Sequence, residues 1–169
     1  GLALGKGATG VEGKAEKGIN DVLFIVSKRI DFEKEKIEYL HLDVFGFSRG
    51  AAAARNFIYR ALENTGLTLE DKLKERGFKI NNPPEVKFTG LFDTVASFGL
   101  FHFNDTSQLK LYSIKKSEYT LQLAAADEHR KKYRRTNIDS VVNSKGCEIL
   151  LPGTHGDIGG GGNDYENEG

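Results

Sequence analysis

The sequence contains no methionine, no tryptophan and a single cysteine among its 169 residues. One cysteine, Cys147, excludes an internal disulfide bond and a thiolate metal cluster, and its apolar neighbours predict a buried thiol. Because no methionine is present that could start translation, we expect this chain to be part of a longer protein. Its length nevertheless suits one domain with a substantial core, and we expect residues 1–169 to form a single, partial domain.

Strong net charge and long apolar runs are also absent. Lys and Arg together number 24, as do Asp and Glu, so the formal net charge is zero and nothing indicates nucleic acid as a partner. No apolar run approaches the roughly 20 residues that cross a bilayer, and no signal-peptide pattern appears. The chain also lacks a His-x-x-x-His pair, carboxylates at ligand spacing and an EF-hand pattern, so neither a metal nor another cofactor is expected.

Hydrophobic periodicity predicts an alternation of helices and strands. Helices are expected over residues 11–30, from residue 49 to about 62, over 69–76 and over 118–135, and strands over 37–45, 86–92 and 147–151. This order favours the α/β class, with a mainly parallel sheet flanked by helices and the chemistry at the strand ends. Thr9 is the expected N-cap of the first helix, with Glu12 as its capping-box partner.

Three glycine-rich or aromatic segments fall outside these elements. Residues 5–10 match G-x-G-x-x-G, but no strand precedes them, so we interpret them as a loop and not as a nucleotide site. Residues 95–103 are apolar and aromatic, and either line an acyl pocket or fill the core. Residues 152–162 are expected to leave the last strand as a loop.

The sequence G-F-S-R-G at residues 46–50 predicts a nucleophile elbow centred on Ser48. An alternating apolar strand precedes it and a run of four alanines follows, which is the strand, turn and helix that this motif requires. The flanking glycines, Gly46 and Gly50, are expected to leave room for a strained turn that presents the hydroxyl. The backbone N–H of Arg49, at the start of the helix, is the expected oxyanion donor.

An activated serine needs a base within hydrogen-bond reach and an acid that orients the base. Only one of the four histidines directly follows a short strand in a glycine-rich loop, and it is therefore the predicted base. That residue is His155, and the three others, interpreted as structural, are His41, His102 and His129.

Asp93 is the predicted acid because it ends the next strand after the nucleophile. The resulting chain order, Ser48, Asp93, His155, is that of α/β-hydrolases. Asp127 and Asp157 are secondary candidates. We interpret Asp127 as a helix-surface or salt-bridging residue and Asp157 as a residue that fixes its own glycine loop through backbone amides.

Four blocks together resemble, in order, the motifs of one family. They are HLDVFGFSRGA at residues 41–51, GLFDTV at 90–95, AADEHR at 125–130 and LPGTHGDIGGG at 151–161. The family is the GFSRGA-type α/β-hydrolase domain of type VI secretion lipase effectors. The sequence departs from it in lacking the family's early strands, whose loops carry the second oxyanion donor, and in having no aromatic residue after the last glycines.

The resemblance implies a phospholipase that cleaves acyl esters of membrane glycerophospholipids with Ser48, Asp93 and His155 as its triad. It also implies synthesis in the bacterial cytoplasm and delivery to the periplasm or membrane of a rival cell. Secretion-spike proteins and an immunity protein are the implied partners, and a membrane phospholipid is the implied substrate.

Two other interpretations remain open from the residues alone. One is a patatin-like esterase with a Ser48–Asp157 dyad, although Asp157 is followed by isoleucine where that class has a D-G-[GA] signature. The other is a non-catalytic α/β module whose glycine loops bind a phosphorylated ligand or a partner protein.

Overall fold

The computed structural model describes residues 10–95, 110–128, 136–139, 141 and 145–161. Its elements are, in chain order, α1 (Val11–Arg29), β1 (Lys36–Ile37), β2 (His41–Phe47), α2 (Arg49–Leu62), α3 (Leu69–Glu75), β3 (Lys79–Ile80), β4 (Glu85–Phe92), the 3-10 helix η1 (Leu111–Lys116), β5 (Ser117–Ala125), β6 (Gly146–Leu151) and α4 (His155–Ile158). Helices and strands are interspersed along the chain, which is an α/β protein, as the sequence predicts.

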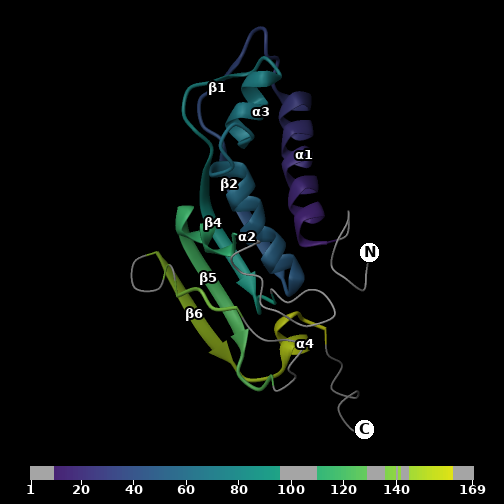
Figure 1. Cartoon of the computed structure of the whole chain (residues 1–169), viewed down its shortest axis with the longest axis vertical. Helices are drawn as coiled ribbons and strands as arrows, with labels where there is room; N and C mark the ends of the chain where they lie inside the picture. The colour runs from purple at the N-terminus through teal and green to yellow at the C-terminus, as the bar shows by residue number, and fades with distance from the viewer. Residues whose placement is uncertain (1–9, 96–109, 129–135, 140, 142–144, 162–169) are drawn as a thin grey trace.

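A parallel sheet of four strands in the order β2-β4-β5-β6 forms the centre of the fold (Figure 1). Since all four strands run in one direction, their carboxyl ends meet at one edge, and α4 lies beside that edge in Figure 1. Strands β1 and β3 form a separate parallel pair at the other end of the molecule. The turns that leave β2, β4 and β6 are thereby brought to one place.

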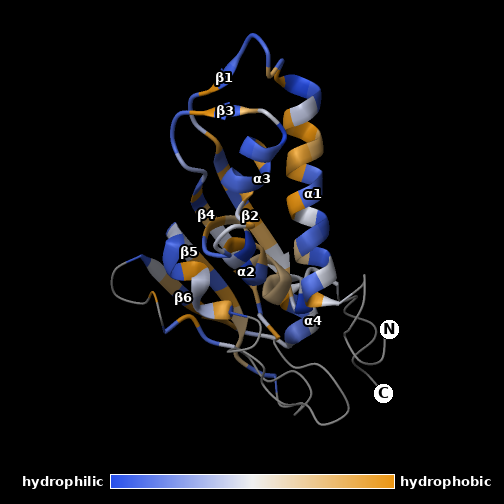
Figure 2. Ribbon diagram, turned by 45° about the horizontal axis from the view of Figure 1, so that its top comes forward, coloured by the Kyte–Doolittle hydropathy of each residue, from blue (hydrophilic) through white to orange (hydrophobic). Residues whose placement is uncertain are grey.

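The core lies between the sheet and two long helices. Helix α2 packs on β2 and β4, and α1 packs on α2. Helix α1 buries residues three or four positions apart, including Ile19 and Leu23, so hydrophobic and hydrophilic residues follow one another along its ribbon in Figure 2. Ile58 of α2 and Leu91 of β4 complete this layer. Each such burial contributes about 1.5–3 kcal/mol.

The prediction of a helix over residues 118–135 is wrong for residues 118–125, because residues 117–125 form the strand β5. The alternation of buried Thr120, Gln122 and Ala124 with more exposed neighbours is that of a strand. Pairing with β4 on one side and β6 on the other overrides the helix propensity of the alanines. Residues 129–135 lie outside the described residues.

Four smaller expectations also differ from the structure. The N-cap of α1 is Gly10, without a side-chain cap, and not Thr9. The strand expected over residues 37–45 is divided into β1 and β2. The segment after β6 contains the single turn of α4, and Cys147 is half-buried where a buried thiol was expected. Among the described residues, no helix is both long and apolar enough to cross a bilayer.

Candidate active site

Ser48 lies in the tight turn between β2 and α2. Its φ of 56° and ψ of −124° are unusual for a residue with a side chain and cost on the order of 1–3 kcal/mol. The turn is tied to the end of β4 by two backbone hydrogen bonds, from Ser48 N to Phe92 O at 2.9 Å and from Val95 N to Ser48 O at 3.3 Å. These bonds hold the strained turn in place from the neighbouring strand.

The two glycines that flank Ser48 have different roles. A Cβ atom at Gly46 would lie 2.4 Å from the carbonyl oxygen of Gly50 and 2.7 Å from Cα of Ala51, so the close approach of backbone to backbone requires glycine there. A Cβ atom at Gly50 would meet nothing within 4 Å. The expectation that glycine leaves room for the turn therefore holds for Gly46 alone.

Asp93 begins the turn that follows β4, and it is 1% exposed. Its φ of 44° is again positive. Its amide donates to Leu123 O at 2.7 Å, and its Oδ1 accepts a hydrogen bond from Ala125 N at 3.2 Å. The end of β5 thus orients the carboxylate and leaves Oδ2 for His155.

His155 is the first residue of α4 and is 5% exposed. Its Nδ1 lies 2.8 Å from Asp93 Oδ2, and its Nε2 lies 2.8 Å from Ser48 Oγ. Both distances lie in the hydrogen-bonding range. The structure therefore brings Ser48, His155 and Asp93 together in one unbroken series. A proton can pass from the hydroxyl to Nε2 along this series, while the carboxylate accepts the Nδ1–H.

Arg49 is the first residue of α2, and among the described residues its backbone N–H donates to no acceptor. The first N–H groups of a helix lack partners within the helix and carry partial positive charge. This N–H directly follows Ser48, which is the position from which an amide can bind the oxyanion that forms on a carbonyl oxygen when Oγ attacks the carbonyl carbon.

Asp157 and Asp127 both bind backbone groups of the segment that carries His155. The carboxylate of Asp157 accepts from Thr154 N at 2.6 Å and from Thr154 Oγ1 at 2.9 Å, which closes a capping box on α4. These bonds lower the pKa of Asp157 below its usual 3.8, the backbone bond most and the hydroxyl bond next.

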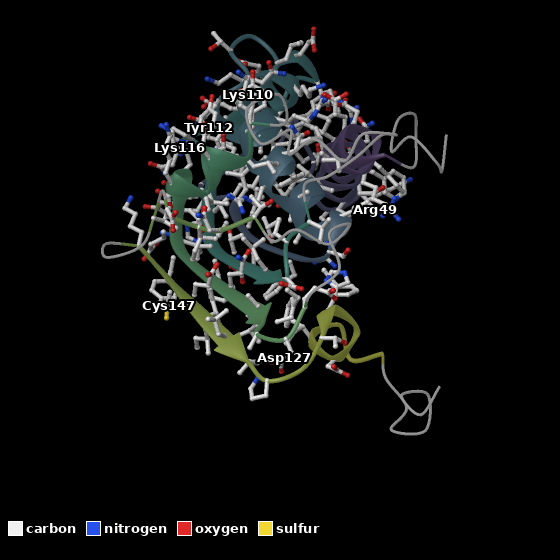
Figure 3. All side chains as sticks on the ribbon, turned by 60° about the horizontal axis from the view of Figure 1, so that its bottom comes forward. Arg49, Lys110, Tyr112, Lys116, Asp127 and Cys147 are labelled. Atoms are coloured by element: carbon white, nitrogen blue, oxygen red, sulfur yellow. The ribbon has the colours of Figure 1, made fainter. Side chains whose placement is uncertain are left out.

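Asp127 follows β5 and accepts a hydrogen bond from Gly153 N at 2.8 Å. The expectation that Asp127 lies on the surface of a helix is wrong, since the chain is not helical there; a salt bridge of Asp127 stays a prediction. Figure 3 shows Asp127 beside α4 and Lys116 at the far end of the sheet, where β5 begins.

Two contacts to His155 were not predicted from the sequence. The ring of Phe47, the residue before Ser48, is stacked on the imidazole, and the carboxylate of Glu128 accepts from His155 N at 3.3 Å. The position of Phe47 inside the elbow motif is the only signal that could have indicated the first contact. For the second contact the signal was the block AADEHR at residues 125–130, which contains Glu128, but that segment was expected to be helical.

The remaining candidates do not join this site. His41 lies at the start of β2 and pairs with Glu85 at 3.4 Å, while His102, His129 and the possible acyl-pocket segment from residue 96 onward lie outside the described residues. In the part of the chain that the structure describes, no three His, Cys, Asp or Glu side chains are grouped so as to hold a metal ion.

Comparison with known proteins relates the chain to secreted effectors. Residues 69–168 match the family described as T6SS, Phospholipase effector Tle1-like, catalytic domain. The solved Tle1 effector bound to the VgrG spike of the type 6 secretion system is 32% identical, with a TM-score of 0.69 over 94% of this chain and 33% of that chain. An uncharacterized protein from Pseudomonas aeruginosa is 21% identical, with a TM-score of 0.49 over 87% of this chain and 22% of its own. No curated protein matches the chain at a significant level.

Proposed function

The chain belongs to the Tle1-like phospholipase effector family of the type VI secretion system, through its catalytic domain, and we propose that it is a serine hydrolase that cleaves acyl esters of membrane glycerophospholipids. The observation that carries the proposal is the series of hydrogen bonds from Asp93 through His155 to Ser48, with 2.8 Å at each step to the imidazole. Its three members come from turns after three different strands, a separation that favours a catalytic role over a local structural one.

In the proposed reaction His155 accepts the Ser48 proton on Nε2 while Oγ attacks the ester carbonyl. The carbonyl oxygen becomes an oxyanion, which the Arg49 N–H binds, and Asp93 stabilises the imidazolium. His155 then gives the proton to the departing alcohol, which leaves an acyl group on Ser48. Water, deprotonated by the same imidazole, releases the fatty acid and restores the hydroxyl.

The proposal is tested by measuring fatty acid released from phosphatidylethanolamine and phosphatidylglycerol vesicles by the full-length protein. Ser48→Ala is expected to lower kcat by about 10⁴-fold or more. Ser27→Ala, which removes a hydroxyl bonded to Leu23 O within α1, is the control and is expected to be fully active. Undiminished hydrolysis by Ser48→Ala would exclude Ser48 as the nucleophile.

His155→Ala separates the triad from a Ser48–Asp157 dyad. A triad enzyme loses activity with this substitution, whereas a dyad enzyme keeps it. A fluorophosphonate probe separates both from a non-catalytic binding module, because the probe labels only an activated serine.

This chain spans about a third of the length of the related Tle1 effector. We propose that the complete protein is carried on a secretion spike into the periplasm or membrane of a target cell. That effector is itself bound to the VgrG spike. A producer of such an enzyme would need an immunity protein. Co-purification of the full-length protein with its spike tests the first of these partnerships.

A further inference from the structure

A group of buried polar side chains is hydrogen-bonded around Thr94, the residue that follows Asp93 in the turn after β4. Its members come from four separate parts of the chain and are mostly inaccessible to solvent: Thr94 and Gln122 are 0% exposed, Arg55 is 3% exposed and Thr136 is 5% exposed. We call these residues, with Glu148 of β6, the Thr94 network. Buried polar groups are costly unless they are hydrogen-bonded, so such a group needs an explanation.

Gln122 is the centre of the network. It lies in β5, and its side chain is bonded at both ends. Its Oε1 accepts from Thr94 Oγ1 at 2.6 Å, and its Nε2 donates to Thr136 O at 3.0 Å and to Glu148 Oε2 at 2.6 Å. The backbone N–H of Thr136 also donates to Thr94 O at 2.8 Å. Thr94, Gln122 and Thr136 are thus joined in a closed ring of hydrogen bonds. Thr94 is therefore held by both its side chain and its backbone.

Arg55 ties this group to the helix that follows the serine turn. From α2 its guanidinium donates to Leu111 O at 2.8 Å, to Asn137 O at 3.0 Å and to Thr136 O at 3.4 Å. Burial lowers its pKa to about 10, and the charge of Glu148 opposes that effect. Burying a charged guanidinium costs free energy of desolvation, and the hydrogen bonds that offset this cost fix the segments whose carbonyls accept them.

Thr94 lies between two residues that belong to the site. Asp93, on one side, has the positive φ of 44° and carries the carboxylate bonded to His155. Val95, on the other side, donates its N–H to Ser48 O. A strained backbone conformation persists only where its surroundings determine it. The bonds of Asp93 to Leu123 and Ala125 fix the residue from the side of β5, and the bonds to Thr94 fix the next residue of the same turn.

We propose that the Thr94 network is a positioning device that holds the Asp93 carboxylate at hydrogen-bonding distance from His155. The inference rests on the proposed function for its kinetic consequence, but its structural part concerns only the Asp93–His155 bond. Among the described residues Thr94 makes no hydrogen bond to the Ser48 hydroxyl or to the His155 imidazole, so it acts through Asp93.

The test replaces Thr94 in the full-length protein and compares two buried threonines of similar chemistry. Thr94→Val keeps the shape of the side chain and removes the bond to Gln122, whereas Thr94→Ser keeps the hydroxyl. Thr89→Val is the matched control. Thr89 is also 0% exposed, and it donates to Ser117 Oγ at 3.0 Å, but it lies in the middle of β4, away from the site.

The first readout needs no substrate. The proton between His155 Nδ1 and Asp93 Oδ2 is expected to give a low-field proton resonance. We expect Thr94→Val to weaken or remove this resonance, and Thr94→Ser and Thr89→Val to retain it. The second readout is kinetic. Thr94→Val is expected to lower kcat at least tenfold at unchanged KM, because a displaced carboxylate gives less stabilisation to the imidazolium that forms in the transition state.

The outcomes separate the two proposals. A wild-type resonance and kcat in Thr94→Val overturn the inference, as does an equal loss in Thr89→Val, which would indicate a general effect on stability. If the wild-type protein shows the resonance but does not hydrolyse lipid, the proposed function fails while the resonance still tests the positioning. Should Thr94→Val not fold, Thr94→Ala removes the same hydroxyl without adding an apolar group and is measured in its place.

Discussion

The ring of Phe47 is stacked on the imidazole of His155, with 4.7 Å between the ring centroids and 27° between the ring planes. Phe47 is the last residue of β2 and immediately precedes Ser48, so the end of one strand leads to the hydroxyl and also orients the imidazole to which that hydroxyl is hydrogen-bonded. Phe47 remains 39% exposed, which means that contact with His155, more than burial in the core, accounts for its position.

Phe47→Ala is expected to lower kcat by about tenfold, because aromatic pairs contribute about 0.5–1.5 kcal/mol beyond their buried area and tenfold in rate corresponds to about 1.4 kcal/mol. Steady-state hydrolysis of vesicles measures the effect. Phe47→Tyr keeps the stacked ring and serves as the control. A Phe47→Ala variant as fast as Phe47→Tyr would show that the ring does not orient His155.

Gly159 is the C-cap of α4, the helix that carries His155, and it lies against the ring of Phe47. A Cβ atom at Gly159 would lie 2.5 Å from the Phe47 ring, whereas one at Gly161 would meet nothing within 4 Å. Gly159→Ala is therefore expected to lower both the melting temperature and kcat, and Gly161→Ala to change neither. In the double variant Phe47→Ala/Gly159→Ala the two losses should be less than additive, and strict additivity would contradict the contact.

The glycines of the serine turn give a second matched pair. Gly46→Ala places a methyl group 2.4 Å from the Gly50 carbonyl oxygen, and we expect loss of the turn, of activity and of several degrees of melting temperature. Gly50→Ala is expected to retain the fold and to gain about 0.4–1 kcal/mol, since alanine restricts the unfolded chain more than glycine does. Circular-dichroism melting curves decide between these expectations, and equal effects of the two substitutions would contradict them.

The lowered pKa of Asp157 predicts a pH dependence of stability. A carboxyl group whose pKa is lower in the folded state than the usual 3.8 stabilises the fold above that pH, and the contribution is lost as the pH falls through the folded value. Asp157→Asn keeps an acceptor for Thr154 but cannot be protonated, so its unfolding free energy should fall less steeply in acid. Urea titrations at pH 7 and at successive values below 3.8 measure the two slopes, and identical slopes would exclude Asp157 as the titrating group.

Much of the fold and the family was predictable from local signals. The glycines, the apolar strand and the alanine run around Ser48 predict a strand, a turn and a helix without reference to the rest of the chain, and the α/β class and the family resemblance are both confirmed. The choice of Asp93 and His155 rested on their places after strands. Their catalytic roles, with that of Ser48, stay predictions.

What could not be predicted depends on contacts between distant segments. The residues of β5 read as a helix because their alanines are good helix formers, and only pairing with β4 and β6 decides otherwise. The stacking of Phe47 on His155 joins residues far apart in the sequence. The bonds of Gln122 to Thr94 and Thr136 likewise follow from register, which composition and periodicity do not specify.

The two backbone bonds between the Ser48 turn and the end of β4 have a consequence for the newly synthesised chain. They join segments that leave the ribosome before β6 and before α4, which carries His155. Domains can begin to fold while synthesis continues, so we expect the serine and carboxylate turns to be ordered together before the imidazole exists. In a nascent chain the two turns would then be paired while the third member of the series is missing, and the series would be complete only when α4 docks beside them.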